Sequence, residues 1–269
     1  METTNLTKDS IKSYLEDGKR FDGRKPDEFR NLEISFDVSK NAEGNARVKL
    51  GKTEVVAGIK LDVGEPYRDS KDKGVLITSA EILGMAGKEY EPGPPKFEAI
   101  ELARIVDRGI RESGMIDFKK LCIKEGEKVW IVFLDIYVIN DDGNLIDAAG
   151  LAGVAALMNA KIPKYNGEEV EYGELTDKNL PLTKDIPLTF TAYKIRNKMI
   201  LDPCKLEEET GNARISLSVS IDKEPKINAG QKGKEGDFSE EEMFKIIDMI
   251  INKSKSFYPE VMKKIKSGK

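Results

Sequence analysis

The stretch VWIVFLDIYVINDDG, residues 129–143, indicates the fold more clearly than any other part of the chain. Residues 129–139 are mostly apolar and rich in β-branched and aromatic side chains, which is typical of a strand. The segment 140–143 has the composition of a turn, and residues 148–160 are rich in Ala and Gly. We predict a strand, a turn and then a helix that ends before Pro163. The small residues of this helix let it lie close against a sheet.

Alternating apolar and polar residues predict further strands on the N-terminal side of this stretch. These strands are expected at 32–38, 46–50, 55–61 and 75–82, with a tight turn at Gly51-Lys52. Helices are expected at 8–17, ended at Gly18, and at 96–113, after a loop rich in Gly and Pro. The pattern therefore predicts a first unit that consists of strands followed by helices.

The C-terminal part repeats this order in a shorter form. Residues 165–185 are polar and weakly patterned, so we expect a linker there. Strands are expected at 187–195, 199–201 and 213–221, a flexible loop at 230–236, and a last helix that starts at a capping box of Ser239 and Glu242. Pro259 is expected to kink or break this helix. The prediction is an α+β chain with units at 1–164 and 186–269.

The composition limits the chemistry that this chain can perform. None of the 269 residues is histidine, which excludes Ser-His-Asp and Cys-His nucleophiles and histidine-bound zinc. No apolar run is long enough to span a membrane, and the N-terminus lacks a secretory signal, so we expect a cytoplasmic protein. Cys122 and Cys204 are expected to be inert thiols, with a disulfide between them as the alternative. The net charge of −4 means that RNA binding would need a local basic patch.

Three arginines on the predicted helix 96–113 share one face, because their spacing is i, i+4 and i+7. They are Arg104, Arg108 and Arg111. In one interpretation they form surface ion pairs, Arg104 with Glu101, Arg111 with Asp107 and Arg108 with Glu112. Such pairs stabilise a helix by only about 0.3–0.5 kcal/mol. The pattern alone favours this solvated face, and a stripe that binds phosphates is the alternative.

Acidic clusters give a weaker signal. Asp141, Asp142 and Asp147 could together bind Mg²⁺, but an Asp-Asp-Gly segment between a strand and a helix is more often a turn. The run 207–209, three glutamates, is equally ambiguous. No metal and no cofactor is expected.

The order and spacing of several short motifs resemble the RNase PH family, over roughly residues 20–257. The motifs are Arg20-Phe21-Asp22-Gly23-Arg24, Gly44-Asn45-Ala46-Arg47-Val48, Gly51-Lys52-Thr53-Glu54-Val55, Asn140-Asp141-Asp142-Gly143, Ala160-Lys161-Ile162-Pro163, Leu201-Asp202-Pro203 and Gly211-Asn212-Ala213. The resemblance implies two RNase PH-like domains with mixed sheets, helices packed on one side, and a left-handed βαβ crossover, against the usual right-handed rule.

The resemblance also implies that the phosphorolytic site of the family is lost. Active members have a Ser or Thr and an Arg in the turn before the alanine-rich helix, where Leu145 and Ile146 stand here. They have an arginine at the start of the preceding helix, where Glu98 stands, and an essential aspartate where Arg214 stands. A chain with these departures resembles a pseudo-enzyme.

This combination is similar to the non-catalytic RNase PH-like subunits of the archaeal exosome. The likeness implies a catalytic RNase PH-like sister subunit in a six-membered ring, RNA-binding cap subunits, and single-stranded RNA held by Arg104 and Arg108, with Arg111 on the same face. Two alternatives stay open. In the first alternative, the chain is an active phosphate-dependent 3′→5′ exoribonuclease that uses Asp142, Asp147 or Glu208. In the second, it is a scaffold whose arginines make interface salt bridges.

Overall fold

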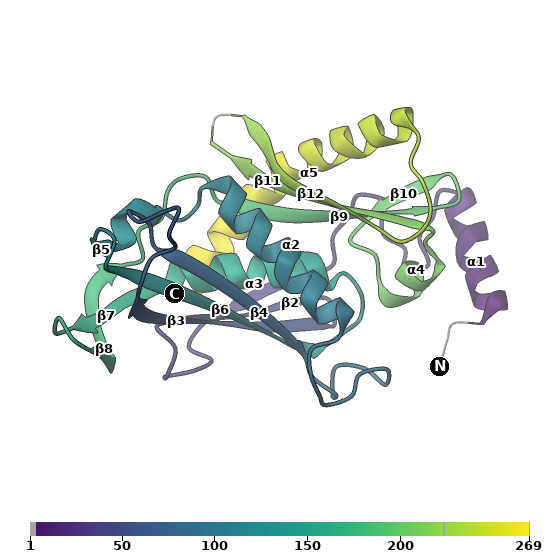
Figure 1. Ribbon diagram of the computed structural model, residues 1–269. Coiled ribbons are helices and arrows are strands. Elements are labelled where there is room, and N and C mark those ends of the chain that lie inside the picture. Colours follow the sequence, from purple (N-terminus) through teal and green to yellow (C-terminus); the bar gives the residue numbers. More distant parts are fainter. Residues whose placement is uncertain (1–3, 223, 269) are drawn as a thin grey trace.

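The computed structural model describes residues 4–222 and 224–268 of the chain (Figure 1). The larger sheet has the strand order β1-β2-β3-β6-β4, and β5 pairs with β6. The strands are β1 (Leu32–Ser35), β2 (Gly44–Leu50), β3 (Thr53–Gly64), β4 (Val75–Ile82), β5 (Cys122–Lys124) and β6 (Lys128–Asn140). Helices α2 (Phe97–Ser113) and α3 (Leu145–Asn159) cover one face of this sheet.

Strand β6 lies between β3 and β4, which explains its apolar sequence. Val132, Leu134, Ile136 and Val138 alternate along it and are at most 1% exposed. The predicted strand at 129–139 is confirmed, and the one at 75–82 has the predicted bounds. Strands β4 and β6 are parallel and are connected through α2. The left hand of this crossover stays a prediction from the resemblance.

The second sheet has the order β10-β9-β11-β12, and helices flank both of its faces (Figure 1). Its elements are β9 (Pro187–Ile195), β10 (Lys198–Leu201), β11 (Ala213–Ile221) and β12 (Pro225–Gly233), with α4 (Lys205–Thr210) and α5 (Glu240–Ser267). Phe190 of β9 packs against Phe257 of α5, with ring centroids 6.0 Å apart. Thr189 points to the opposite face, where a Cβ on Gly150 of α3 would lie 2.8 Å from its hydroxyl. Helices α2 and α3 therefore lie between the two sheets.

This close packing explains why α3 is rich in small residues. Every side chain from Ile146 to Leu157 is buried, because the helix touches a sheet on each side. Gly153 faces Leu134 of β6, and Gly150 faces Thr189 of β9. The prediction of a small-residue helix that lies close to a sheet is confirmed, although α3 begins at Leu145 instead of Ala148.

Several details differ from the sequence predictions. The segment 165–185, expected to be a linker, contains the strand β8 (Val170–Asn179), which pairs with β7 (Lys161–Tyr165). Pro163 lies in β7, and α3 ends before it, at Asn159. The prediction of a flexible loop at 230–236 is wrong for residues 230–233. These residues belong to β12, where hydrogen bonds with β11 hold them in a sheet. The domain bounds at 164 and 186 stay a proposal.

The terminal helices also differ from expectation. Helix α1 (Asn5–Glu16) begins three residues before Lys8, because the Thr4 side chain caps it. The capping box of Ser239 and Glu242 is confirmed. Helix α5 continues through Pro259, and its buried side chains beyond the proline, such as Val261, offset the lost hydrogen bond. Among the described residues, no helix is long and apolar enough to cross a membrane.

Candidate functional site

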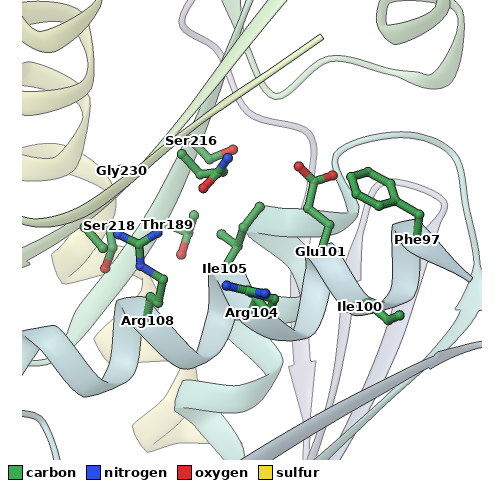
Figure 2. Close-up of a pocket in the computed structure, with 12 residues that line it drawn as sticks. Phe97, Ile100, Glu101, Arg104, Ile105, Arg108, Thr189, Ser216, Ser218 and Gly230 are labelled. Carbon is green, nitrogen blue, oxygen red and sulfur yellow. The ribbon is translucent and has the colours of Figure 1, made fainter. Parts of the chain in front are cut away.

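A cavity of about 400 Å³ lies between α2 and the second sheet (Figure 2). Its walls come from elements far apart in the sequence, so only the packing of α2 against β9, β11 and β12 creates it. The lining residues are Phe97, Ile100, Glu101, Arg104, Ile105, Arg108, Thr189, Ser216, Ser218, Ala229, Gly230 and Gln231. The cavity thus joins two guanidinium groups from the helix to three hydroxyl groups from the strands.

Arg104 and Arg108 stand on the cavity side of α2 with unsatisfied charges. Both are exposed, and neither makes a hydrogen bond or an ion pair within residues 4–222 and 224–268. The expected pairs of Arg104 with Glu101 and of Arg108 with Glu112 are therefore wrong. Two neighbouring cations without an internal partner favour an external anion over a salt-bridged helix face.

Arg111 behaves differently from the other two arginines. Its guanidinium donates to the Asp107 carboxylate at 2.8 and 3.0 Å and to the Leu76 carbonyl at 3.0 Å. The expected pair of Arg111 with Asp107 is confirmed. Burial opposes the charge, but the hydrogen bond with Asp107 outweighs it and raises the pKa of Arg111. The helix face therefore divides into two free arginines and one that ties α2 to β4.

Glu101 is the acidic group of the cavity, and Arg214 neutralises it. The carboxylate and the guanidinium are 2.5 Å apart, with side chains 22% and 13% exposed. Burial disfavours the charge on Arg214, yet the hydrogen bond with Glu101 raises the pKa of the guanidinium. Since Glu101 is paired with an arginine of β11, it leaves the charges of Arg104 and Arg108 uncompensated.

Hydroxyl groups form the floor of the cavity. Thr189, Ser216 and Ser218 are 6%, 1% and 4% exposed, on the face of β9 and β11 that looks toward α2 and α3. The strand predictions do not by themselves point to these residues. A signal was present, however, because Thr189 and Thr191 alternate with apolar residues, as Ser216 and Ser218 do. Small hydroxyl residues on a buried strand face indicate a close approach or a polar site.

The turn before α3 is closed by the chain's own groups. Gly143 has φ = +89°, and a Cβ there would lie 2.5 Å from the backbone of Cys204 and Lys205. The Asn144 N–H, at the N-terminus of α3, donates to the Glu208 carboxylate at 2.9 Å. Because this carboxyl group already accepts the N–H at the positive end of the helix, an incoming anion would have to displace it there.

The acidic residues near this turn have protein partners. Asp141 accepts hydrogen bonds from the Tyr90 hydroxyl at 2.7 Å, from the Gly143 N–H at 3.0 Å and from Lys205. Desolvation opposes the charge of Lys205, but the hydrogen bond with Asp141 outweighs it and raises the lysine pKa. No group of three metal-binding side chains occurs in the part of the chain that the structure describes. The partners of Asp141 are those of a residue that stabilises the turn.

Asp147 is fully buried at the start of α3. It accepts hydrogen bonds from the Thr191 N–H at 3.0 Å, the Thr191 hydroxyl at 2.7 Å and the Asn144 amide at 2.9 Å. Burial raises the pKa of Asp147 to about 7, although these hydrogen bonds act in the opposite direction. The residue fixes α3 to β9 and has no path to solvent as a catalytic base.

The arginines of the 20–24 motif are structural. Arg20 donates to the Glu207 carboxylate at 2.5 and 2.9 Å, and both side chains are at most 1% exposed. Arg24 and Arg30 donate to Asp202 at 2.7–3.0 Å. Burial disfavours the charged Asp202, but the hydrogen bonds from Arg30 lower its pKa overall. The motif binds the N-terminal segment to the loop that leads into α4.

Comparison with known proteins decides the family. The models of domains 1 and 2 of the 3′ exoribonuclease family match residues 28–163 and 185–249. The chain belongs to the RNase PH family. The resemblance drawn from the motifs is therefore confirmed.

Two curated relatives show how close the similarity is. The chain is 47% identical to the exosome complex component Rrp42 of Archaeoglobus fulgidus over 249 residues, which are 92% of this chain and 93% of the relative. It is 46% identical to the exosome complex component Rrp42 of Methanosarcina acetivorans over 250 residues, or 93% and 91% of the two chains.

Solved structures support the assignment to the RNase PH family. A chain of the Archaeoglobus fulgidus exosome with RNA bound to the active site has a TM-score of 0.86 and 42% identity, covering 95% of this chain and 98% of that one. A chain of an archaeal exosome core has a TM-score of 0.83 and 40% identity, with coverages of 96% and 97%. The expected fold, with two RNase PH-like domains, is confirmed, but the second sheet is not mixed and its helices are not confined to one side. All of its strand pairs are antiparallel, and α5 packs on the face opposite to α2 and α3.

The positions predicted as lost from the family's active site do not line the cavity, although Arg214 contacts its lining residue Glu101. Leu145 and Ile146 are half-buried and buried at the first turn of α3. Glu98 is exposed in the first turn of α2 and faces the loop before it. None of these side chains, nor that of Arg214, lines the cavity. Their correspondence to catalytic residues stays a prediction from the resemblance.

Proposed function

We propose that this chain is a non-catalytic RNA-binding subunit of an archaeal-type exosome. In this proposal it pairs with a catalytic RNase PH-like sister in a six-membered ring that carries RNA-binding cap subunits. The assembly degrades single-stranded RNA from the 3′ end with phosphate. This chain structures the sister's active site, and its arginines hold the RNA. No cofactor is needed, and the location proposed is the cytoplasm, where both cysteines, free in the structure, stay reduced.

The observation that carries this proposal is the contrast between α2 and the turn before α3. Helix α2 presents Arg104 and Arg108 without internal partners. The turn presents the opposite situation, because Glu208 already accepts the N–H of Asn144 at the helix N-terminus. One surface can therefore attract the RNA backbone, while a phosphate nucleophile would have to displace the Glu208 carboxyl group at the turn.

The two arginines are suited to an extended RNA backbone. They are four residues apart on α2, so they stand one helical turn apart, a rise of about 6 Å. Phosphates supply most of the affinity in such complexes, and guanidinium groups bind them through paired hydrogen bonds. The relatives named above are exosome components, and one of the similar solved structures contains RNA.

An active enzyme with rearranged residues is less well supported. Asp147 is buried and bonded to Thr191 and Asn144, which leaves it no access to a substrate. Glu208 is engaged with the backbone of Asn144, and burial raises its pKa. Asp142 is half-buried, and it lies beside Arg30 rather than in the cavity. The proposed role therefore does not include chemistry.

Assembly with the sister subunit gives a direct test. Strand β4 is an edge strand of the larger sheet, and its Ile77 is 40% exposed. Exposed apolar surface and open strand edges are typical of partner interfaces. Light scattering should find a closed ring when the two chains are mixed, and this ring should bind single-stranded RNA more tightly than the sister alone. A stable monomer that ignores the sister would contradict the proposal.

A further inference from the structure

The cavity beside Arg104 and Arg108 has features that phosphate binding alone does not require. Two exposed cations on a helix would suffice for the RNA backbone. Here they open onto a concave space of about 400 Å³ with hydroxyl groups at its base. This volume lies within the range of roughly 300–1,000 Å³ that small-molecule sites occupy. A ligand larger than a phosphate therefore fits.

The direction of the hydrogen bonds defines what the base of the cavity presents. When Asp147 is ionised it can only accept, so Thr191 donates its single hydroxyl proton to this carboxylate at 2.7 Å. The oxygens of Thr191 and Ser216 are 2.9 Å apart, so in this ionised state Ser216 donates its own proton to Thr191. The Ser216 oxygen is left with lone pairs and no proton to offer. It thus presents an acceptor, and the matching ligand group is a hydrogen-bond donor.

Two further hydroxyl groups stand beside Ser216. Thr189 Oγ1 has no hydrogen-bond partner in the described part of the chain, although the residue is only 6% exposed. Ser218 makes one long contact, 3.5 Å, with the Gly109 carbonyl. Figure 2 shows the Arg108 side chain reaching toward Thr189 and Ser218. One ligand in the cavity could therefore contact both the guanidinium groups and the hydroxyl groups.

The charges around the cavity agree with an anionic, hydroxyl-bearing ligand. Arg104 and Arg108 are unpaired, and the single acidic lining residue, Glu101, is neutralised by Arg214. Phe97 and Ile100 stand at the exposed end of the cavity with apolar surface. A phosphate next to the arginines, a sugar over the hydroxyls and a base near Phe97 would use each of these groups.

We propose that this cavity binds one ribonucleoside phosphate unit and that Ser216 and Thr189 recognise its ribose hydroxyl groups. The proposal rests on the RNA-binding role above and adds discrimination between RNA and DNA. The 2′-hydroxyl is the group that distinguishes the two sugars, and it supplies the donor that Ser216 requires. The unit is either part of an RNA chain or a free nucleotide.

The test uses the complex with the catalytic sister, with phosphate omitted so that RNA is not consumed. The dissociation constants of a single-stranded oligoadenylate and its deoxy counterpart are measured, and their ratio is compared between variants. Ser216→Ala and Thr189→Val should each lower the preference for RNA about threefold to tenfold, with DNA affinity unchanged. Ser220→Ala is the matched control, because Ser220 is buried on the same strand and bonds Asn228 outside the cavity.

Competition with AMP and dAMP identifies the source of the ligand. Displacement by AMP but not dAMP assigns the cavity to free ribonucleotides, whereas a changed oligonucleotide ratio without AMP binding assigns it to the RNA chain. Either result supports the proposal. The proposal would be overturned if both variants kept the wild-type ratio of RNA to DNA affinity. It would also be overturned if the variants kept this ratio but no longer assembled with the sister, because that result would mean that a side chain of the sister fills the cavity. Failure of the RNA-binding role itself would give a different result. In that case, replacing Arg104 and Arg108 would leave the affinities for RNA and for DNA unaltered.

Discussion

The double substitution Arg104→Ala and Arg108→Ala tests how the RNA backbone is held. Both guanidinium groups lack an internal partner, so their removal breaks no contact within the fold. A buried charge-assisted hydrogen bond contributes about 1.5–3 kcal/mol. Since both side chains are exposed, solvent screening reduces each contact to about 1 kcal/mol. RNA affinity of the assembled complex should therefore fall by about thirtyfold.

The salt dependence gives a second, independent magnitude. Each phosphate contact on a single strand contributes about 0.7 to the slope of log K against log salt, so two contacts should flatten it by about 1.4. Fluorescence anisotropy of a short single-stranded RNA at several salt concentrations measures both quantities. The control is Lys119→Ala with Lys120→Ala, which removes two exposed cations from the short 3-10 helix Phe118–Leu121 that follows α2. Unchanged affinity and slope in the arginine variant would refute the backbone contact.

Three further predictions concern contacts within the fold. Arg111→Ala should lower the free energy of unfolding more than RNA affinity, because Arg111 binds Asp107 and the β4 backbone; urea titration and anisotropy separate the two. The pKa of Asp147 is raised from 3.8 to about 7, so the folded state binds more protons and loses stability as pH rises from 5 to 7, by at most about 1.4 kcal/mol per pH unit. Asp147→Asn should flatten that profile in urea melts, and an already flat wild-type profile would contradict the assignment. Glu207→Gln, which leaves Arg20 buried without a full counter-charge, should cost about 3–5 kcal/mol in the same assay.

Elements with strong local patterns could be predicted from the sequence. Strand β6 alternates buried side chains with more accessible ones from Trp130 to Val138, and α2 has an apolar face with arginines opposite, so their positions follow from periodicity. The α5 capping box identified the start of that helix. Tertiary contacts decided the other elements. Strands β8 and β12 are edge strands of polar sequence, and α5 continues through Pro259 because its buried side chains outweigh one lost hydrogen bond.

Sequence analysis could predict the arginines of the candidate site but not the groups that surround them. Helical spacing placed Arg104 and Arg108 on one face, but the partner of Glu101 could not be inferred, since Arg214 lies 113 residues away. The hydroxyl groups of β9 and β11 meet the arginines only because Gly109 and Gly150 let α2 and α3 approach the second sheet. Local patterns carry no information on such an approach. The remaining site residues therefore needed the structure.

Phosphorolysis by the purified chain is the most direct test of the central claim. A 3′-labelled single-stranded RNA is incubated with phosphate and with this chain, with the catalytic sister, or with both, and release of nucleoside diphosphate is measured. The account predicts no release by this chain alone, and more release by the pair than by the sister, because this chain adds the RNA contacts of Arg104 and Arg108. Phosphate-dependent release of nucleoside diphosphate by this chain alone would contradict it.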